Sequence, residues 1–378
     1  MRVRSDRNVF GVSFLQGFLA AIFFSYPGPP FYLFSFILLV LGVLFYLMQG
    51  SRRPRPDVFI LILISLYAGN AIFSTLINSE YFIQRGVSLV GTVFCISLFY
   101  YGALILNYRN FWRGHVFCSG WLAMLVIALF LLSESYRYGA KLFVLPEYRL
   151  WGQGYFFDWP NYTFMPLIIS LFVRRIYRER ISVVDICMAF ACVITTSRVA
   201  ILGVLVFAFC FMSIEKQAWL IVVGLVFIAI FPLVAPYVDT ALLVDRATKI
   251  SDREHLFSGL VNAWLMSPVW GWGSVKVSDV FPDTFYDSFH NSYLEVLVKT
   301  GLMGLFLYIL MLGYLVFRPA LERHLRWDRG FAYFYLAAFF LLFASMVQNY
   351  LKHPHIIIIF SVLCYSVRVS GAEIAMRR

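Results

Sequence analysis

The residues of this chain best suited to chemistry are one histidine and two arginines beside long apolar runs. His290 stands two residues before Ser292, and Ser292 with Glu295 forms a capping-box pattern that predicts Ser292 as the N-cap of an apolar helix. The unpaired N–H groups and the positive dipole at a helix start disfavour imidazolium and favour neutral imidazole. His290 therefore suits a general base, and a structural role is the alternative for a single loop histidine.

Arg198 lies between two apolar segments that almost no loop separates. A cation at such a point is costly unless it reaches a polar cavity or the membrane interface. One interpretation is an arginine that extends to the lipid headgroups. The other is an anion-binding arginine at the outer surface of the membrane, which the tightly constrained position favours.

Arg253 falls in the first turn of a predicted helix, where Ser251 and Glu254 form a second capping box. A cation in a first turn opposes the helix dipole. The conflict disappears if Arg253 and the helix N-terminus share one bound anion such as a phosphate. The alternative is a plain ion pair between Arg253 and a neighbouring carboxylate.

The same predicted helix carries an apolar stripe made by Leu256, Leu260 and Trp264, and it ends at the Ser-Pro pair 267–268. This pattern predicts an amphipathic helix that lies on the membrane or over a cavity. The segment 270–273, Trp-Gly-Trp-Gly, follows it. Its indoles suit either the membrane interface or stacking on sugar rings.

The composition is that of a membrane protein. Of the 378 residues, 61% are hydrophobic and only 13% are charged, and the mean hydropathy is +0.78. The net charge of +11 does not indicate nucleic acid, because excess Lys and Arg marks the cytoplasmic loops of such proteins. The six cysteines all lie in apolar runs and are expected to be free, buried thiols.

The apolar runs predict an all-α polytopic membrane protein with about twelve transmembrane helices. Placing the N-terminus in the cytoplasm puts the short, arginine-rich loops and the C-terminus there too, as the positive-inside rule requires. Residues 1–378 are interpreted as a single membrane domain. Residues 237–291, between the ninth and tenth segments, are expected to form a large helical loop on the extracytoplasmic side. The predicted segments are 9–26, 31–48, 58–78, 86–106, 114–133, 160–174, 182–197, 199–213, 218–236, 292–317, 330–349 and 354–369.

Several chemistries lack their motifs in this chain. The first outer loop has no acidic residue, and no Asp-x-Asp, His-Glu-x-x-His, P-loop or paired intramembrane aspartate is found. These absences point away from metal-dependent glycosyltransferases, metalloproteases and ATPases. We therefore expect neither a metal nor another cofactor.

Three patterns carry a resemblance to a known family. The first is Thr195-x-Ser-Arg198, in which Val199 replaces the usual small residue. The second joins Arg253 to a tryptophan and a Pro-x-x-Gly-x-Gly loop. The third, the most specific, starts at His290 as His-Asn-x-x-Leu and ends in Gly-x-x-Gly. The residues of the second and third patterns are Arg253, Trp264, Pro268, Gly271, Gly273, His290, Asn291, Leu294, Gly301 and Gly304.

The chain resembles the O-antigen ligase and polymerase superfamily of bacterial inner membranes. The resemblance lies in these three patterns, in their order along the chain and in the predicted layout of about twelve transmembrane helices. The resemblance implies metal-independent transfer of a glycan from undecaprenyl diphosphate at the periplasmic face. Arg198 and Arg253 are then expected to hold the pyrophosphate, and His290 to activate or orient the acceptor hydroxyl. A ligase transfers the glycan to lipid A core, and a polymerase adds it to another lipid-linked repeat.

Two other classes remain open from the sequence. A transporter of a lipid-linked sugar would use Arg198 at an alternating-access site, but such proteins commonly show internal symmetry, and none is evident here. A structural membrane scaffold is the third interpretation. The ligase is placed ahead of the polymerase by a narrow margin, since both need the same donor chemistry.

Overall fold

A computed structural model of the chain describes residues 2–22, 29–48, 57–78, 82–132, 160–177, 179–194, 198–211, 251–281, 289–321, 329–347 and 350–376. Within these ranges every regular element is a helix, which confirms the predicted all-α class. Two compact units are formed. The first comprises Met1–Cys118, Phe172–Arg180 and His255–Arg378, and the second comprises Ser119–Leu171 and Ile181–Glu254.

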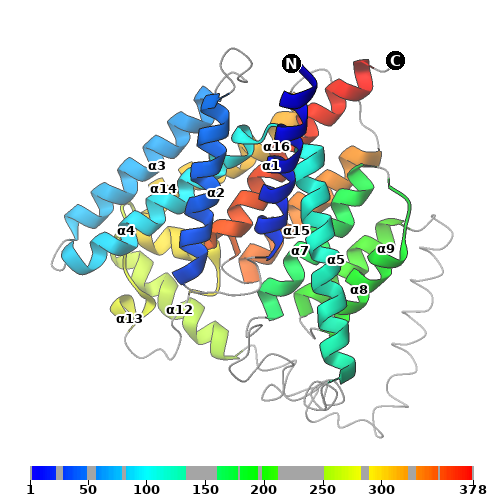
Figure 1. The fold of residues 1–378 in the computed structure, drawn as a ribbon. Helices are drawn as coiled ribbons and strands as arrows, with labels where there is room; N and C mark the ends of the chain where they lie inside the picture. The colour runs from blue at the N-terminus through cyan, green and yellow to red at the C-terminus, as the bar shows by residue number, and fades with distance from the viewer. Residues whose placement is uncertain are drawn as a thin grey trace, which may run out of the picture. The chain divides into compact units, whose positions relative to one another are not determined.

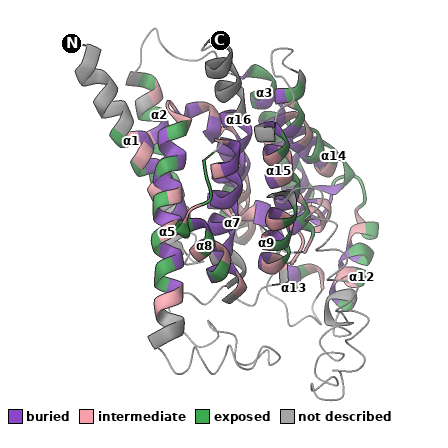
Figure 2. Cartoon of the chain, turned by 90° about the vertical axis from the view of Figure 1, so that its right-hand side faces the viewer, coloured by how far each residue is buried: buried purple, intermediate pink, exposed green. Residues whose placement is uncertain are grey.

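The first unit contains most of the described helices (Figure 1). α16 contacts η3, α15, α14, α2 and α1, and α3 contacts both α14 and α4. Figure 2 shows that α16 is buried over residues 354–366, as its apolar sequence requires. The elements of this unit are α1 (Arg2–Ile22), α2 (Pro29–Met48), α3 (Val58–Ile77), α4 (Phe82–Ser97), η3 (Leu98–Leu104), the start of α5 (Tyr108–Leu132), most of α12 (Ser251–Met266), α13 (Val277–Val280), α14 (Ser292–Leu321), α15 (Arg329–Val347), η6 (Tyr350–Lys352) and α16 (Pro354–Met376).

The second unit contains the later part of α5, most of α7 (Pro160–Ile176), α8 (Val183–Ile194) and α9 (Arg198–Phe211). Small residues let these helices approach closely. The Ser170 hydroxyl donates to Ser119 Oγ at 2.9 Å, and Ser119 donates to the carbonyl of Pro166 at 3.3 Å. These bonds satisfy polar groups where the membrane interior offers no water.

Four described helical stretches are long and apolar enough to cross a membrane: 58–77, 85–104, 108–128 and 292–320. Shorter apolar helices cover 11–21, 35–44, 183–193, 199–209, 331–347 and 354–366. The chain is therefore a multi-pass membrane protein, and the total of about twelve spans stays a prediction. The predicted span 218–236, and residues 237–250 and 282–288 of the predicted loop, lie outside the described residues.

One end of the first unit is held by a carboxylate. Asp57 caps α3, and its oxygens accept from the hydroxyls of Tyr314 (3.1 Å) and Tyr365 (3.0 Å) and pair with the Arg318 guanidinium. Only 6% of the Asp57 side chain and 15% of the Arg318 side chain are exposed. The start of α3 and the end of α14 therefore lie together, on the side that the sequence assigns to the cytoplasm.

The prediction of free, buried thiols is confirmed for four of the five described cysteines, and Cys187 is free but not fully buried. The four buried thiols are Cys95, Cys118, Cys192 and Cys364.

Candidate functional site

Helix α14 is broken at Gly301, where φ is 66° and ψ is −168°. Only glycine adopts this conformation at low cost. The backbone of another segment also passes too close for a side chain, because a Cβ on Gly301 would collide with the carbonyl of Val269. Gly271 lies in the same segment as Val269, and a Cβ added to Gly271 would lie 2.5 Å from the Gly301 nitrogen. The glycines of two sequence patterns thus meet at one backbone crossing.

The crossing segment satisfies the backbone groups that the break leaves unpaired. The Trp272 N–H donates to the carbonyl of Val298 at 2.8 Å, and the Leu302 N–H donates to the carbonyl of Pro268 at 2.9 Å. In a membrane interior an unpaired backbone group costs several kcal/mol, so such a break requires these partners. The Pro-x-x-Gly-x-Gly segment therefore stabilises the break in α14 through backbone hydrogen bonds.

Helix α3 holds the crossing from a third direction. The Asn70 amide donates to the carbonyl of Thr300 at 3.0 Å, and the Asn78 amide donates to the carbonyl of Gly271 at 2.9 Å. Arg85 on α4 then donates to the carbonyl of Asn78 at 2.5 Å. The start of α14 is thereby fixed against α3 and α4.

His290 lies immediately before this fixed helix start. It is partly exposed and has φ 50°, the one positive φ of a non-glycine residue in the described ranges. The predicted N-cap is wrong by one residue. The Asn291 side chain accepts from the N–H groups of Tyr293 (2.9 Å) and Leu294 (3.0 Å), so Asn291 is the N-cap. Ser292 is the first helical residue, and the amide oxygen occupies the place predicted for its hydroxyl.

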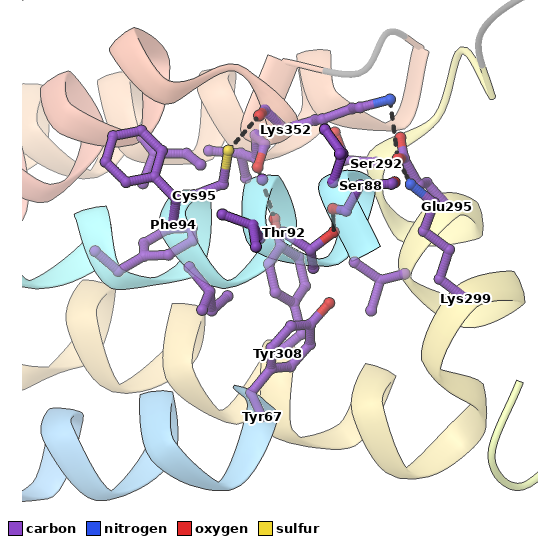
Figure 3. Close-up of a pocket in the computed structure, with 18 of the residues that line it drawn as sticks. Tyr67, Ser88, Thr92, Phe94, Cys95, Ser292, Glu295, Lys299, Tyr308 and Lys352 are labelled. Atoms are coloured by element: carbon purple, nitrogen blue, oxygen red, sulfur yellow. Dashed lines mark hydrogen bonds and ion pairs between the residues drawn. The ribbon is translucent and has the colours of Figure 1, made fainter. Parts of the chain in front are cut away.

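A cavity of about 670 Å³ opens beside the start of α14 (Figure 3). Its polar lining comes from α3, α4, α14 and the short turn η6. Its volume lies in the range of small-molecule sites, about 300–1,000 Å³. The polar and charged residues that line it are Tyr67, Ser88, Thr92, Ser292, Glu295, Lys299, Tyr308 and Lys352.

A buried carboxylate joins two lysines in the wall of this cavity. The Lys299 ammonium lies 2.6 Å from Glu295 Oε1, and the Lys352 ammonium lies 3.0 Å from the same oxygen. The side chains of Glu295 and Lys299 are 6% and 10% exposed, whereas that of Lys352 is 37% exposed. Lys299 also lies over the ring of Phe289, 5.4 Å from its centroid. The trio therefore carries one positive charge in excess.

The remaining wall of the cavity is apolar. It includes Phe36 of α2, Val87, Val90 and Phe94 of α4, and Leu351 of η6. Phe36, Val87 and Val90 are also strongly exposed. Exposed apolar side chains on a membrane-spanning unit suit contact with lipid chains.

The structure describes the backbone of all three predicted site residues, but the side chain of His290 alone. Arg198 is the first residue of α9 and Arg253 lies in the first turn of α12, as expected from the sequence, and both belong to the second unit. Their side chains and residues 195–197 lie outside what the structure describes. His290 belongs to the first unit. That the three side chains meet in one site stays a prediction.

The sequence reasoning missed Glu295 and Lys352 as site residues and left Lys299 outside the catalytic set. A signal was present for one pair, since Glu295 and Lys299 stand four residues apart, the spacing of a helical ion pair. Lys352 offered no such signal because a turn far along the chain delivers it to the cavity.

Helix α12 begins and ends where the sequence predicted, and its apolar stripe packs on protein. Leu256 and Leu260 are buried against Val275, Phe289 and Val298. This cluster ties α12 to the residue before His290 and to α14. The predicted helix thus covers part of the first unit, while its opposite side remains exposed.

The two tryptophans after α12 differ in their surroundings. Trp272 donates its indole N–H to the carbonyl of Ala263 at 2.7 Å and is partly buried. Trp270 is 39% exposed and its ring meets Phe73 edge-on at 4.9 Å. Trp272 is therefore structural, and Trp270 remains accessible to the membrane interface or a ligand.

Together, the helices define a multi-pass membrane protein with a charged cavity beside the start of α14. The O-antigen ligase family model matches residues 183–309, about one third of the chain. This match supports the resemblance to the O-antigen ligase and polymerase superfamily that the motifs indicated. The matched region includes Arg198, Arg253 and His290. No curated protein matches the chain.

Proposed function

We propose that the protein is a glycosyltransferase that moves a glycan from undecaprenyl diphosphate to lipid A core. The family match carries this proposal, because one matched region contains all three residues expected to act. The structural support is the fixed position of His290 before the capped start of α14. Arg198 and Arg253, each at or near a helix N-terminus, suit the binding of an anionic diphosphate.

The proposed reaction needs no metal. The acceptor hydroxyl attacks the anomeric carbon, and the bond between that carbon and the diphosphate oxygen breaks. Negative charge then develops on the leaving diphosphate, where the guanidinium groups of Arg198 and Arg253 stabilise it. The hydroxyl proton passes to His290, which acts as the general base. Undecaprenyl diphosphate is the second product.

We place this reaction at the periplasmic face of the bacterial inner membrane, with both termini in the cytoplasm. Asp57 and Arg318 mark one end of the α3–α14 pair. The cavity and His290 belong to the start of α14, at the opposite end of that helix from Arg318. Arginine-rich segments flank the first end in the sequence, so the positive-inside rule assigns it to the cytoplasm.

A polymerase that joins lipid-linked repeats is the second candidate. The donor chemistry and the roles of Arg198, Arg253 and His290 are the same in both reactions.

The test uses the full chain in nanodiscs, with undecaprenyl-diphosphate glycan as donor, EDTA present, and lipid A core either supplied or omitted. Glycan on lipid A core supports the ligase, and longer lipid-linked chains without core support the polymerase. His290→Ala should lose at least about a hundredfold in turnover, the usual scale for a general base. His255→Ala, an exposed histidine on α12, is the matched control. If the chain binds the donor but transfers no glycan, the proposal of a glycosyltransferase is overturned in favour of a transporter.

A further inference from the structure

The trio of Glu295, Lys299 and Lys352 has no part in the reaction proposed above. Two ammonium groups share a single carboxylate oxygen, and one of them, Lys352, is exposed enough to reach a ligand. An ammonium group has three donors, so bonds to Glu295 leave others for a second partner. A buried excess of positive charge favours an anion beside it.

A second observation points to a ligand at the same place. The Ser292 hydroxyl lines the cavity, its residue is 2% exposed, and its oxygen has no hydrogen-bond partner among the described residues. A buried hydroxyl without a partner is costly, and a bound acceptor removes that cost. Figure 3 shows Ser292, Glu295 and Lys352 around the same end of the cavity.

The rest of the cavity determines what kind of anion fits. Val87, Val90 and Phe36 form an apolar wall whose side chains are also exposed on the surface, which suits contact with a lipid chain. A free phosphate would leave this wall unused. A chain attached to a phosphate group satisfies both the charged end and the apolar wall of the cavity.

We propose that Lys299, Lys352 and Ser292 bind the phosphate group of a single-chain polyprenyl lipid whose chain lies along the apolar wall between α2 and α4. Glu295 is the positioning residue that holds the two ammonium groups together. The proposal rests on the proposed function only in the choice of a polyprenyl chain. The site is additional to the diphosphate site assigned to Arg198 and Arg253.

The test measures binding to the purified full chain in nanodiscs by scintillation proximity, with radiolabelled farnesyl diphosphate as the probe. Lys352→Gln should weaken binding by about tenfold, equivalent to ~1.4 kcal/mol. Lys276→Gln, an exposed lysine that does not line the cavity, should leave the affinity unchanged. Equal affinities of the two variants would overturn the proposal, as would failure of the wild-type chain to bind the probe.

A second pair of variants tests the chain-binding wall. Gly91 lines the cavity, and a Cβ there meets no atom within 4 Å, so Gly91→Leu fills the cavity without a backbone clash. Gly69→Leu on α3 is the matched control, because it is equally open but does not line the cavity. Gly91→Leu should weaken farnesyl diphosphate binding severalfold relative to Gly69→Leu. Equal affinities of these variants would refute the chain position.

Competitors separate the sources of the phosphate. If inorganic pyrophosphate competes as strongly as unlabelled farnesyl diphosphate, the site recognises free phosphate groups and the lipid assignment is overturned. Phosphatidylglycerol that competes equally would overturn the polyprenyl choice in favour of a membrane phospholipid. Glycan transfer is measured separately. If the wild-type chain transfers glycan but does not bind the probe, this site alone is rejected. If the wild-type chain binds the probe but transfers no glycan, the proposed reaction alone is rejected.

Discussion

The break in α14 leads to a quantitative prediction for Gly301→Ala. The native φ of 66° with ψ of −168° costs an alanine about 1–3 kcal/mol. The new Cβ also collides with the carbonyl of Val269, so the crossing segment has to move. That movement is expected to break the backbone hydrogen bonds between Trp272 and Val298 and between Leu302 and Pro268.

Each of those bonds contributes roughly 0.5–1.5 kcal/mol. The total expected destabilisation is therefore about 2–6 kcal/mol. Because the start of α14 carries His290 and the cavity lysines, glycan transfer and farnesyl diphosphate binding should fall together with stability.

Thermal unfolding in detergent, followed by tryptophan fluorescence, measures the effect. Gly313→Ala is the matched control, since Gly313 lies in the same helix and a Cβ there meets no atom within 4 Å. That substitution should stabilise the protein slightly, by about 0.5–1 kcal/mol, because alanine favours a helix. If both variants unfold at the same temperature, the break does not depend on glycine and this reasoning is refuted.

Three further predictions concern single side chains. Asp57→Asn removes the charge that pairs with Arg318 and should destabilise the protein by about 3–5 kcal/mol in chemical denaturation. An unchanged denaturation midpoint would show that this ion pair does not stabilise the fold. Asn291→Ala removes the N-cap of α14 and should cost about 0.5–2 kcal/mol, with Asn291→Ser retaining most of the stability; equal losses for both would contradict the cap. Burial, aided by nearby Lys352, lowers the pKa of His353 to about 3 in the folded chain, so the unfolded chain binds more protons below a pH of about 6.5. The unfolding temperature should thus fall as the pH drops from 7 to 4, and His353→Gln should reduce that fall; identical pH profiles would contradict it.

The sequence predicts local features of this chain with good precision. The capping box at Ser251 predicts the start of α12, and the Ser-Pro pair at 267–268 predicts its end. Such signals succeed because helix ends depend on hydrogen bonds within a few residues. The failure at Ser292 has the same origin, since Asn291 and Ser292 are both capping types and only the local backbone decides between them.

The residue patterns also indicate the superfamily, but they do not reveal why the glycines recur. The apolar run from 292 onward predicts a continuous helix, and Gly301 within it is compatible with one. The break exists because the segment after α12 supplies partners for the freed backbone groups. No local preference encodes that partnership, because the interacting residues are far apart in the chain.

By itself, the sequence determined that the chain is a helical membrane protein, where several helices end, and which residues are candidates for binding a diphosphate and moving a proton. These conclusions follow from composition, periodicity and short motifs, which act locally. Only the tertiary structure brought Lys352 to Glu295 and placed the Ser292 hydroxyl, which has no hydrogen-bond partner among the described residues, in the wall of a cavity. The physical reason is that a buried charge finds its partner through the packing of distant helices, and sequence spacing carries no record of that packing.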